Sequence, residues 1–337
     1  MGIDAPSNIP AETLEQRYFS NLQRLEKVDL STIYPPEMKQ RSWQLAAEGP
    51  ELEEFMSRIH RSDLPPGGRF SEGVTAVFRS NDGLMFAAPA LPNNPQFRTL
   101  LLDMLAAMRD LSPWASAVGM KRDNNSRLFD TNRAAMYTFA INWIVYYPAV
   151  IRNIVNGIGD DRYTPQQKQG FIIEDVASLI HECVHMNNSQ DLDFGGPHRV
   201  LVELAPITCE YLAFSGRNPK MSALAENALR LLTDESIGGD SYSEGLLLGL
   251  VILAQQDGAL GENDNRSDLV QNLEMWKLGL EKLDREELDY KRRQYEQVLL
   301  SENDVVVRDK ILELGEKYPV SLGLLSLVDW LKKTTIT

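Results

Sequence analysis

Residues that could bind a metal ion and activate a water molecule are concentrated in one short stretch, Ser178–Asn188. It contains His181, Glu182 and His185 in the pattern His-Glu-x-x-His. With about 3.6 residues per helical turn, the two histidines lie on one face of a helix and can reach the same divalent cation. Glu182 is predicted to accept a proton from a water molecule on that cation, which is the arrangement that metal-assisted hydrolysis requires.

A single amphipathic helix that begins at Pro165 is predicted to carry this motif. Its apolar residues recur at helical spacing and form one stripe: Ile172, Ile173, Val176, Leu179, Ile180 and Val184. The stripe indicates a helix packed against the protein interior, so that the two histidines lie close to buried side chains. Thr164 precedes the helix and is expected to cap its first turn. In the alternative interpretation, the histidines face solvent or bond to backbone carbonyls and bind no metal.

These residues resemble the active-site helix of the zincin metallopeptidases, and the resemblance is confined to His181–Glu210. It implies a zinc ion held by the two histidines of the motif and a third protein ligand, with an open position for a reactant. The gluzincin branch is favoured, in which a glutamate on a downstream helix, here Glu203, completes the set. The chain departs from the metzincin pattern, because Asn188 and Asp191 stand in place of its glycine and its third histidine. It departs from the gluzincins at Val202, where an asparagine usually precedes the glutamate.

The third ligand is expected on a second helix, Pro197–Phe214, which follows a short polar loop. If the two helices pack antiparallel across this loop, Glu203 lies at a distance from it comparable to that of the two histidines, and it ranks first. His198 and Glu210 are the alternative third ligands. The resemblance further suggests a side chain that steadies an oxyanion, for which Tyr242 and His198 are the candidates.

The rest of the chain predicts a mainly α-helical protein: a multi-helix bundle with one small β-hairpin at about residues 74–88 and a metal site between two antiparallel helices. Two apolar runs joined by Asn81-Asp82-Gly83 indicate the hairpin. A further helix is expected from Pro35 to about Ala47, and Pro148 is expected to kink or split the apolar segment 131–155. A helical metalloenzyme domain is predicted over residues 1–260, with a C-terminal helical subdomain, residues 261–337, packed on it.

Length and composition exclude several classes of protein. With 337 residues, 43% of them hydrophobic, the chain can bury a sizeable core. Its net charge of −14 disfavours nucleic acid as a partner, because such a surface repels phosphate backbones. The longest apolar run, Gly245–Ala254, is shorter than the roughly 18 to 20 residues that cross a bilayer, so no membrane partner is expected. The two cysteines exclude a disulfide framework, and without a visible secretory signal the expected location is cytoplasmic.

Three functions follow from these features, in order of preference. The first is a zinc-dependent hydrolase that cleaves a peptide or amide bond of a peptide or protein substrate, with Glu182 as the base. The second is a non-haem Fe²⁺ enzyme, a 2-oxoglutarate-dependent peptide hydroxylase that uses the same helix, with Arg199 or Arg217 as the anchor of its cosubstrate. The third is a helical interaction protein without catalytic activity.

Overall fold

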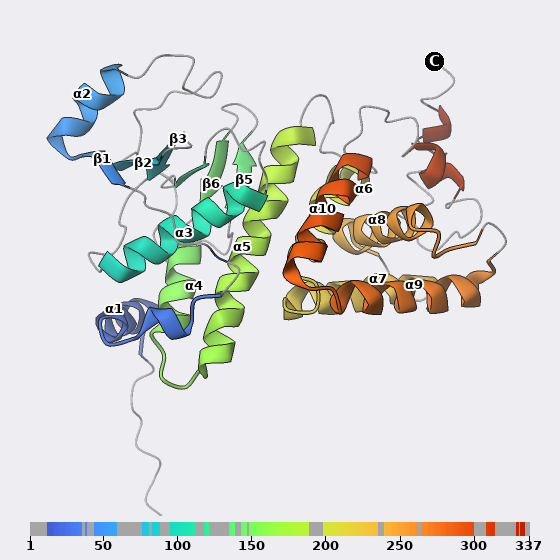
Figure 1. Ribbon diagram of the computed structural model, residues 1–337, viewed down its shortest axis with the longest axis horizontal. Coiled ribbons are helices and arrows are strands. Elements are labelled where there is room, and N and C mark those ends of the chain that lie inside the picture. Colours follow the sequence, from blue (N-terminus) through green and yellow to red (C-terminus); the bar gives the residue numbers. More distant parts are fainter. Residues whose placement is uncertain are drawn as a thin grey trace, which may run out of the picture.

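The fold of the protein is given by a computed structural model (Figure 1). It describes residues 12–35, 38, 44–58, 76–80, 83–87, 95–111, 118–120, 135–138, 143–146, 148–188, 198–234, 239–261, 264–299, 308–313, 328–329 and 331–333. Most of these residues are helical, which confirms the prediction of a mainly α-helical protein.

The elements fall into two groups on either side of the longest helix. The helices are α1 (Leu14–Leu25), α2 (Pro50–Arg58), α3 (Pro95–Leu111), α4 (Pro148–Ile158), α5 (Pro165–Asn188), α6 (His198–Ala213), α7 (Pro219–Thr233), α8 (Ser241–Gln256), α9 (Arg266–Glu281) and α10 (Arg285–Leu299). The strands are β1 (Gln44–Glu48), β2 (Ala76–Ser80), β3 (Gly83–Ala87), β4 (Val118–Met120), β5 (Ala135–Thr138) and β6 (Trp143–Tyr146). In Figure 1, α1 to α4 and the strands lie on one side of the molecule and α6 to α10 on the other, with α5 between them.

The strands form one mixed sheet in the order β1-β2-β3-β4-β6-β5. β2 and β3 make the expected hairpin, with Ala76 opposite Ala87 and Ser80 opposite Gly83. β1 pairs antiparallel with β2, and β5 pairs antiparallel with β6, whereas β4 is parallel to both β3 and β6. The sheet is therefore larger than the one small hairpin that the sequence indicates, because four further strands extend it.

Two expectations about local structure have different outcomes. The helix expected from Pro35 to about Ala47 is wrong at its end, where Gln44–Glu48 is strand β1. Pairing with β2 provides hydrogen-bond partners for this backbone, so the tertiary context overrides the local helical pattern. Pro148 splits the apolar segment as expected: β5 and β6 precede it, and it is the first residue of α4. At that position the missing backbone N–H of proline is tolerated.

One apolar core joins most of the helices. It includes Ile172 and Val176 of α5, Leu204 of α6 and Leu273 of α9, together with Tyr295 of α10. Helices on both sides of residue 260 therefore share this core. The division into a domain of residues 1–260 and a subdomain of residues 261–337 stays a prediction.

α6, which carries the candidate carboxylate ligands, packs between α5 and α8. Two glycines of α8 allow a close approach to α6. A Cβ at Gly245 would lie 3.2 Å from the backbone nitrogen of Leu204, and one at Gly249 would overlap Oγ1 of Thr208. Because neither position has a side chain, the backbone of α8 can pack directly against α6.

The start of α5 is fixed by local hydrogen bonds. The backbone N–H of Gln167 donates to Oγ1 of Thr164 (3.3 Å), and the backbone N–H of Thr164 donates to Oε1 of Gln167 (2.9 Å). This capping box confirms Thr164 as the cap. Just before it, Asp160 accepts hydrogen bonds of 3.0 Å from both the backbone N–H and Nε of Arg162, which orders the loop that leads into the helix.

Candidate metal centre

Three side chains with metal-binding atoms meet in the interior between α5 and α6. His181 and His185 come from successive turns of α5, and Glu203 comes from α6. The Nε2 atoms of the two histidines are 3.0 Å apart. Oε2 of Glu203 lies 3.1 Å from Nε2 of His181 and 3.4 Å from Nε2 of His185. The three residues are buried, with exposed fractions of 6%, 8% and 5%. They form a group that could bind a metal ion, as the sequence predicts.

The triangle formed by these three atoms has the size that a small divalent cation requires. In a tetrahedral site with bonds of about 2.0 to 2.1 Å, simple geometry places the ligand atoms about 3.3 Å apart. The separations of 3.0, 3.1 and 3.4 Å lie on either side of that value. Imidazole nitrogen and carboxylate oxygen are also ligands that first-row metals accept. The residues present therefore fit a metal ion.

The charge of the cluster is suited to a cation. Burial opposes ionisation of Glu203, but hydrogen bonds from the two imidazoles, and their positive charge while they are protonated, outweigh it and lower the pKa of this carboxyl group to about 2. A bound metal ion would take the place of those protons, because the imidazole that ligates a metal is neutral. Glu203 is thus ionised at neutral pH, and the carboxylate is the form that ligates metals.

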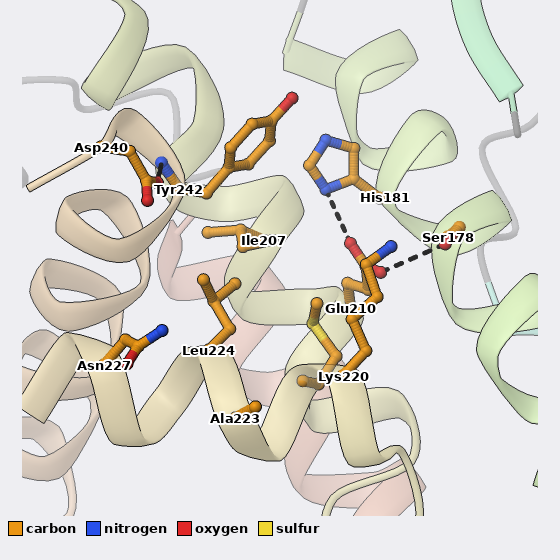
Figure 2. Close-up of a pocket in the computed structure, with 11 residues that line it drawn as sticks. Ser178, His181, Ile207, Glu210, Lys220, Ala223, Leu224, Asn227, Asp240 and Tyr242 are labelled. Atoms are coloured by element: carbon orange, nitrogen blue, oxygen red, sulfur yellow. Dashed lines mark hydrogen bonds and ion pairs between the residues drawn. The ribbon is translucent and has the colours of Figure 1, made fainter. Parts of the chain in front are cut away.

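Glu210 approaches His181 from the other side of its ring. Its Oε2 lies 3.1 Å from Nδ1 of His181, and its Oε1 accepts a hydrogen bond of 3.4 Å from Oγ of Ser178 (Figure 2). A carboxylate beside Nδ1 favours the tautomer with the proton on that nitrogen, which leaves the lone pair of Nε2 facing the cluster. Glu210, one of the alternative third ligands, therefore lies behind His181 rather than beside Glu203.

The contacts between the two helices fix their relative direction. His185 meets Glu203, His181 meets both Glu203 and Glu210, and Ser178 meets Glu210. Residue numbers thus fall along α5 as they rise along α6. The two helices run antiparallel, as expected, and this arrangement brings Glu203 to the two histidines.

Two residues of the predicted site lie in described helices, but their side chains lie outside the part of the chain that the structure describes. Glu182 follows His181 in α5, and His198 is the first residue of α6. The base assigned to Glu182 and the ligand or oxyanion role considered for His198 stay predictions.

A cavity of about 520 Å³ opens beside the cluster (Figure 2). α5, α6, α7 and the start of α8 contribute its walls: Ser178, His181, Ile207, Glu210, Lys220, Met221, Ala223, Leu224, Asn227, Asp240 and Tyr242. Its volume lies within the range of about 300 to 1,000 Å³ that is typical of ligand sites. A substrate in this cavity would reach the cluster on the side of His181.

Tyr242, a candidate for steadying an oxyanion, lies next to the cluster. The centroid of its ring is 6.0 Å from that of His181, and the guanidinium carbon of Arg199 lies 5.8 Å from the same tyrosine ring. In Figure 2 the hydroxyl group of Tyr242 lies on the same side as the ring nitrogen of His181 that faces away from Glu210. The side chain is 37% exposed, so a substrate could reach it.

Two parts of the site were not predicted from the sequence: Ser178 and the wall formed by α7. Ser178 precedes His181 by three residues and so lies on the same face of α5, a spacing that could have identified it. Leu224 and Asn227 reach the cavity only because α7 packs beside α5 and α6. A single sequence holds no signal for that packing.

Compared with protein-family models, with curated proteins and with solved structures, the chain matches none. The resemblance to zincins rests on the motif alone. Among the described residues, a helix with the length and hydropathy of a membrane span is not found.

Proposed function

We propose that the protein is a zinc-dependent hydrolase that cleaves a peptide or amide bond. The observation that carries this proposal is the buried cluster of His181, His185 and Glu203, of which His181 lines a cavity of about 520 Å³. These three residues would hold the zinc ion, which when bound lowers the pKa of a water molecule towards about 7 and polarises a carbonyl group.

The chain's own residues would carry the proton transfers. Glu182 accepts a proton from the attacking water and delivers it to the nitrogen of the leaving amine as the carbon–nitrogen bond breaks. Tyr242 donates a hydrogen bond to the oxygen on which negative charge develops. Glu210 holds the imidazole of His181 in the tautomer and orientation that the cluster needs.

A test of this proposal compares metal-loaded wild type with the variant Glu182→Gln on a peptide library analysed by mass spectrometry. We expect the wild type to cleave peptides, and the variant to retain its metal and lose cleavage. Glu226→Gln, which changes an exposed carboxylate of α7, serves as the matched control and should behave as wild type. Full activity of Glu182→Gln, or of metal-free protein, would refute the mechanism.

A second candidate function is favoured by the position of Arg199. Two histidines and a carboxylate also suit Fe²⁺ in 2-oxoglutarate-dependent hydroxylases, which need a cation to bind the cosubstrate. The guanidinium group of Arg199 lies over the ring of Tyr242, which neighbours His181, whereas Arg217 lines a different cavity. Peptide hydroxylation that depends on added Fe²⁺, 2-oxoglutarate and oxygen, without peptide cleavage, would select this function over hydrolysis.

A further inference from the structure

A second cavity, of about 780 Å³, lies further along α5, towards its N-terminus. Its walls come from the start of α5, from Tyr163 just before it, and from residues 216–219, which lead into α7. Its volume also falls within the range of about 300 to 1,000 Å³ found for ligand sites. None of the residues that line this cavity belongs to the cluster of His181, His185 and Glu203.

The two cavities follow one stripe of α5. The cavity of about 520 Å³ beside His181 is here called the near cavity, and the one of about 780 Å³ the far cavity. Gly170 and Glu174 line the far cavity, and Ser178 and His181 line the near cavity. These residues are spaced by three or four positions, so they lie one above another on the same face of the helix. The near and far cavities therefore open along a single line that ends at the metal cluster.

An exposed ion pair marks the place where the cavities adjoin. Nζ of Lys220, which lines the near cavity, lies 4.0 Å from Oε1 of Glu174, which lines the far one. The two side chains are 57% and 41% exposed. Because exposed pairs of this kind contribute little to stability, these side chains can move apart when a ligand lies between them.

We propose that the two cavities form one binding groove for an extended polypeptide, which runs along α5 from the cluster of His181, His185 and Glu203 to Gly170. The inference rests on the proposed hydrolase function and specifies its substrates as peptides rather than small amides. From His181 to Gly170 the helix rises by 11 residues, or about 16 Å at 1.5 Å per residue. An extended chain advances about 3.3 Å per residue, so the groove accommodates about five residues on one side of the scissile bond.

The side chains of the far cavity match an extended peptide. The amide groups of Gln166 and Gln169 can both donate and accept hydrogen bonds, as the backbone of a bound chain requires. Tyr163 and Phe171 pack edge to face with ring centroids 5.1 Å apart and provide an apolar wall for side chains. The far cavity thus combines polar groups for a main chain with an aromatic surface for its side chains.

Gly170 offers a way to block the far cavity without touching the metal cluster. A Cβ built at this position meets no atom within 4 Å, so a leucine side chain would project into open space. Gly279 of α9 has equally open surroundings and does not line either cavity, which makes Gly279→Leu the matched control. Leucine is also a better helix former than glycine, so we expect both variants to fold.

The experiment measures kcat/KM of metal-loaded protein for a series of peptides lengthened on either side of one cleaved bond. For wild type and Gly279→Leu, we expect kcat/KM to rise at least about tenfold as one side grows to about five residues, and then to level off. Gly170→Leu should lose this gain while keeping its metal content and its activity on the shortest peptides. Equal dependence on length in Gly170→Leu and Gly279→Leu, or no dependence in wild type, would overturn the groove.

A binding measurement separates failure of the groove from failure of the proposed function. The probe is a fluorescein-labelled peptide of about ten residues, mixed with metal-loaded Glu182→Gln protein and followed by fluorescence anisotropy. The same measurement is made on the double variant Glu182→Gln/Gly170→Leu. If wild type cleaves no peptide, but the probe binds Glu182→Gln and binds the double variant about tenfold more weakly, the groove stands and the hydrolase proposal fails. If the probe does not bind, or if Gly170→Leu leaves its binding unchanged, the groove is refuted.

Discussion

Removing the carboxylate of Glu210 should weaken metal binding although this residue is not one of the three residues proposed to hold the ion. Glu210 is only 4% exposed, and its Oε2 lies 3.1 Å from Nδ1 of His181. Replacement by alanine leaves this ring nitrogen without its carboxylate and removes the acceptor of the hydrogen bond from Ser178. The imidazole of His181 then loses the group that fixes its tautomer and orientation.

The expected size of the effect follows from the kind of contact that is lost. Carboxylates that orient metal-bound histidines typically change metal affinity by about 10- to 100-fold, which corresponds to about 1.4 to 2.7 kcal/mol. Glu210→Gln keeps an oxygen that can accept a hydrogen bond from Nδ1–H, but it loses the negative charge, so we expect about tenfold weaker metal binding. Glu210→Ala loses both the acceptor oxygen and the negative charge, so its metal binding should be weaker by up to about 100-fold.

The assay is competition for Zn²⁺ between the protein and a chromophoric chelator at fixed pH. Glu226→Gln, an exposed carboxylate of α7, is the control and should bind zinc as wild type does. Circular dichroism of each variant in the metal-free state checks that the fold is retained. Zinc affinity of Glu210→Ala equal to that of wild type would refute the orienting role of Glu210. Complete loss of zinc in Glu210→Gln would instead indicate that Glu210 is itself a ligand.

Two further predictions concern stability. Gly249→Ala should lower the free energy of unfolding, measured in urea, by about 1 to 3 kcal/mol, because the added Cβ overlaps Oγ1 of buried Thr208. Gly279→Ala should raise it by about 0.5 to 1 kcal/mol, because a Cβ there meets no atom within 4 Å. Equal stability of the two variants would contradict this packing. Hydrogen bonds from the Arg162 side chain lower the pKa of Asp160 from 3.8 to about 2, against an opposing effect of burial. The stabilisation by Asp160 is thus present above pH 3.8 and is lost as pH falls through about 2. Asp160→Asn should therefore have a lower free energy of unfolding than wild type at neutral pH, and this difference should vanish as pH falls through about 2. A difference in stability that does not depend on pH would contradict the assignment.

The cluster of His181, His185 and Glu203 could be predicted from sequence because its geometry is largely local. The spacing of His181 and His185 places both rings on one face of any helix, and the apolar stripe of α5 indicates which face is buried. Glu203 could be ranked first because a short loop makes two helices antiparallel and limits which residues can meet. The position of Glu210 behind His181 needs the rotation of α6 about its axis, and the sequence does not specify this rotation.

The sheet shows where sequence reasoning was insufficient. The strands β4, β5 and β6 have only three or four residues each, too few for an alternating pattern to be distinguished from a turn of helix. β1 has the composition of a helix end and becomes a strand only through its pairing with β2. The hairpin of β2 and β3 was predictable because Asn81-Asp82-Gly83 is a local turn signal.

The central claim is that His181, His185 and Glu203 jointly hold one metal ion, and the metal content of protein purified without added metal tests it most directly. Inductively coupled plasma mass spectrometry should find about one equivalent of a first-row metal per wild-type chain. His185→Ala, purified in parallel and shown to be folded, should contain almost none. Wild-type protein without bound metal that also fails to take up added Zn²⁺ or Fe²⁺, or a metal content unchanged in His185→Ala, would contradict the account.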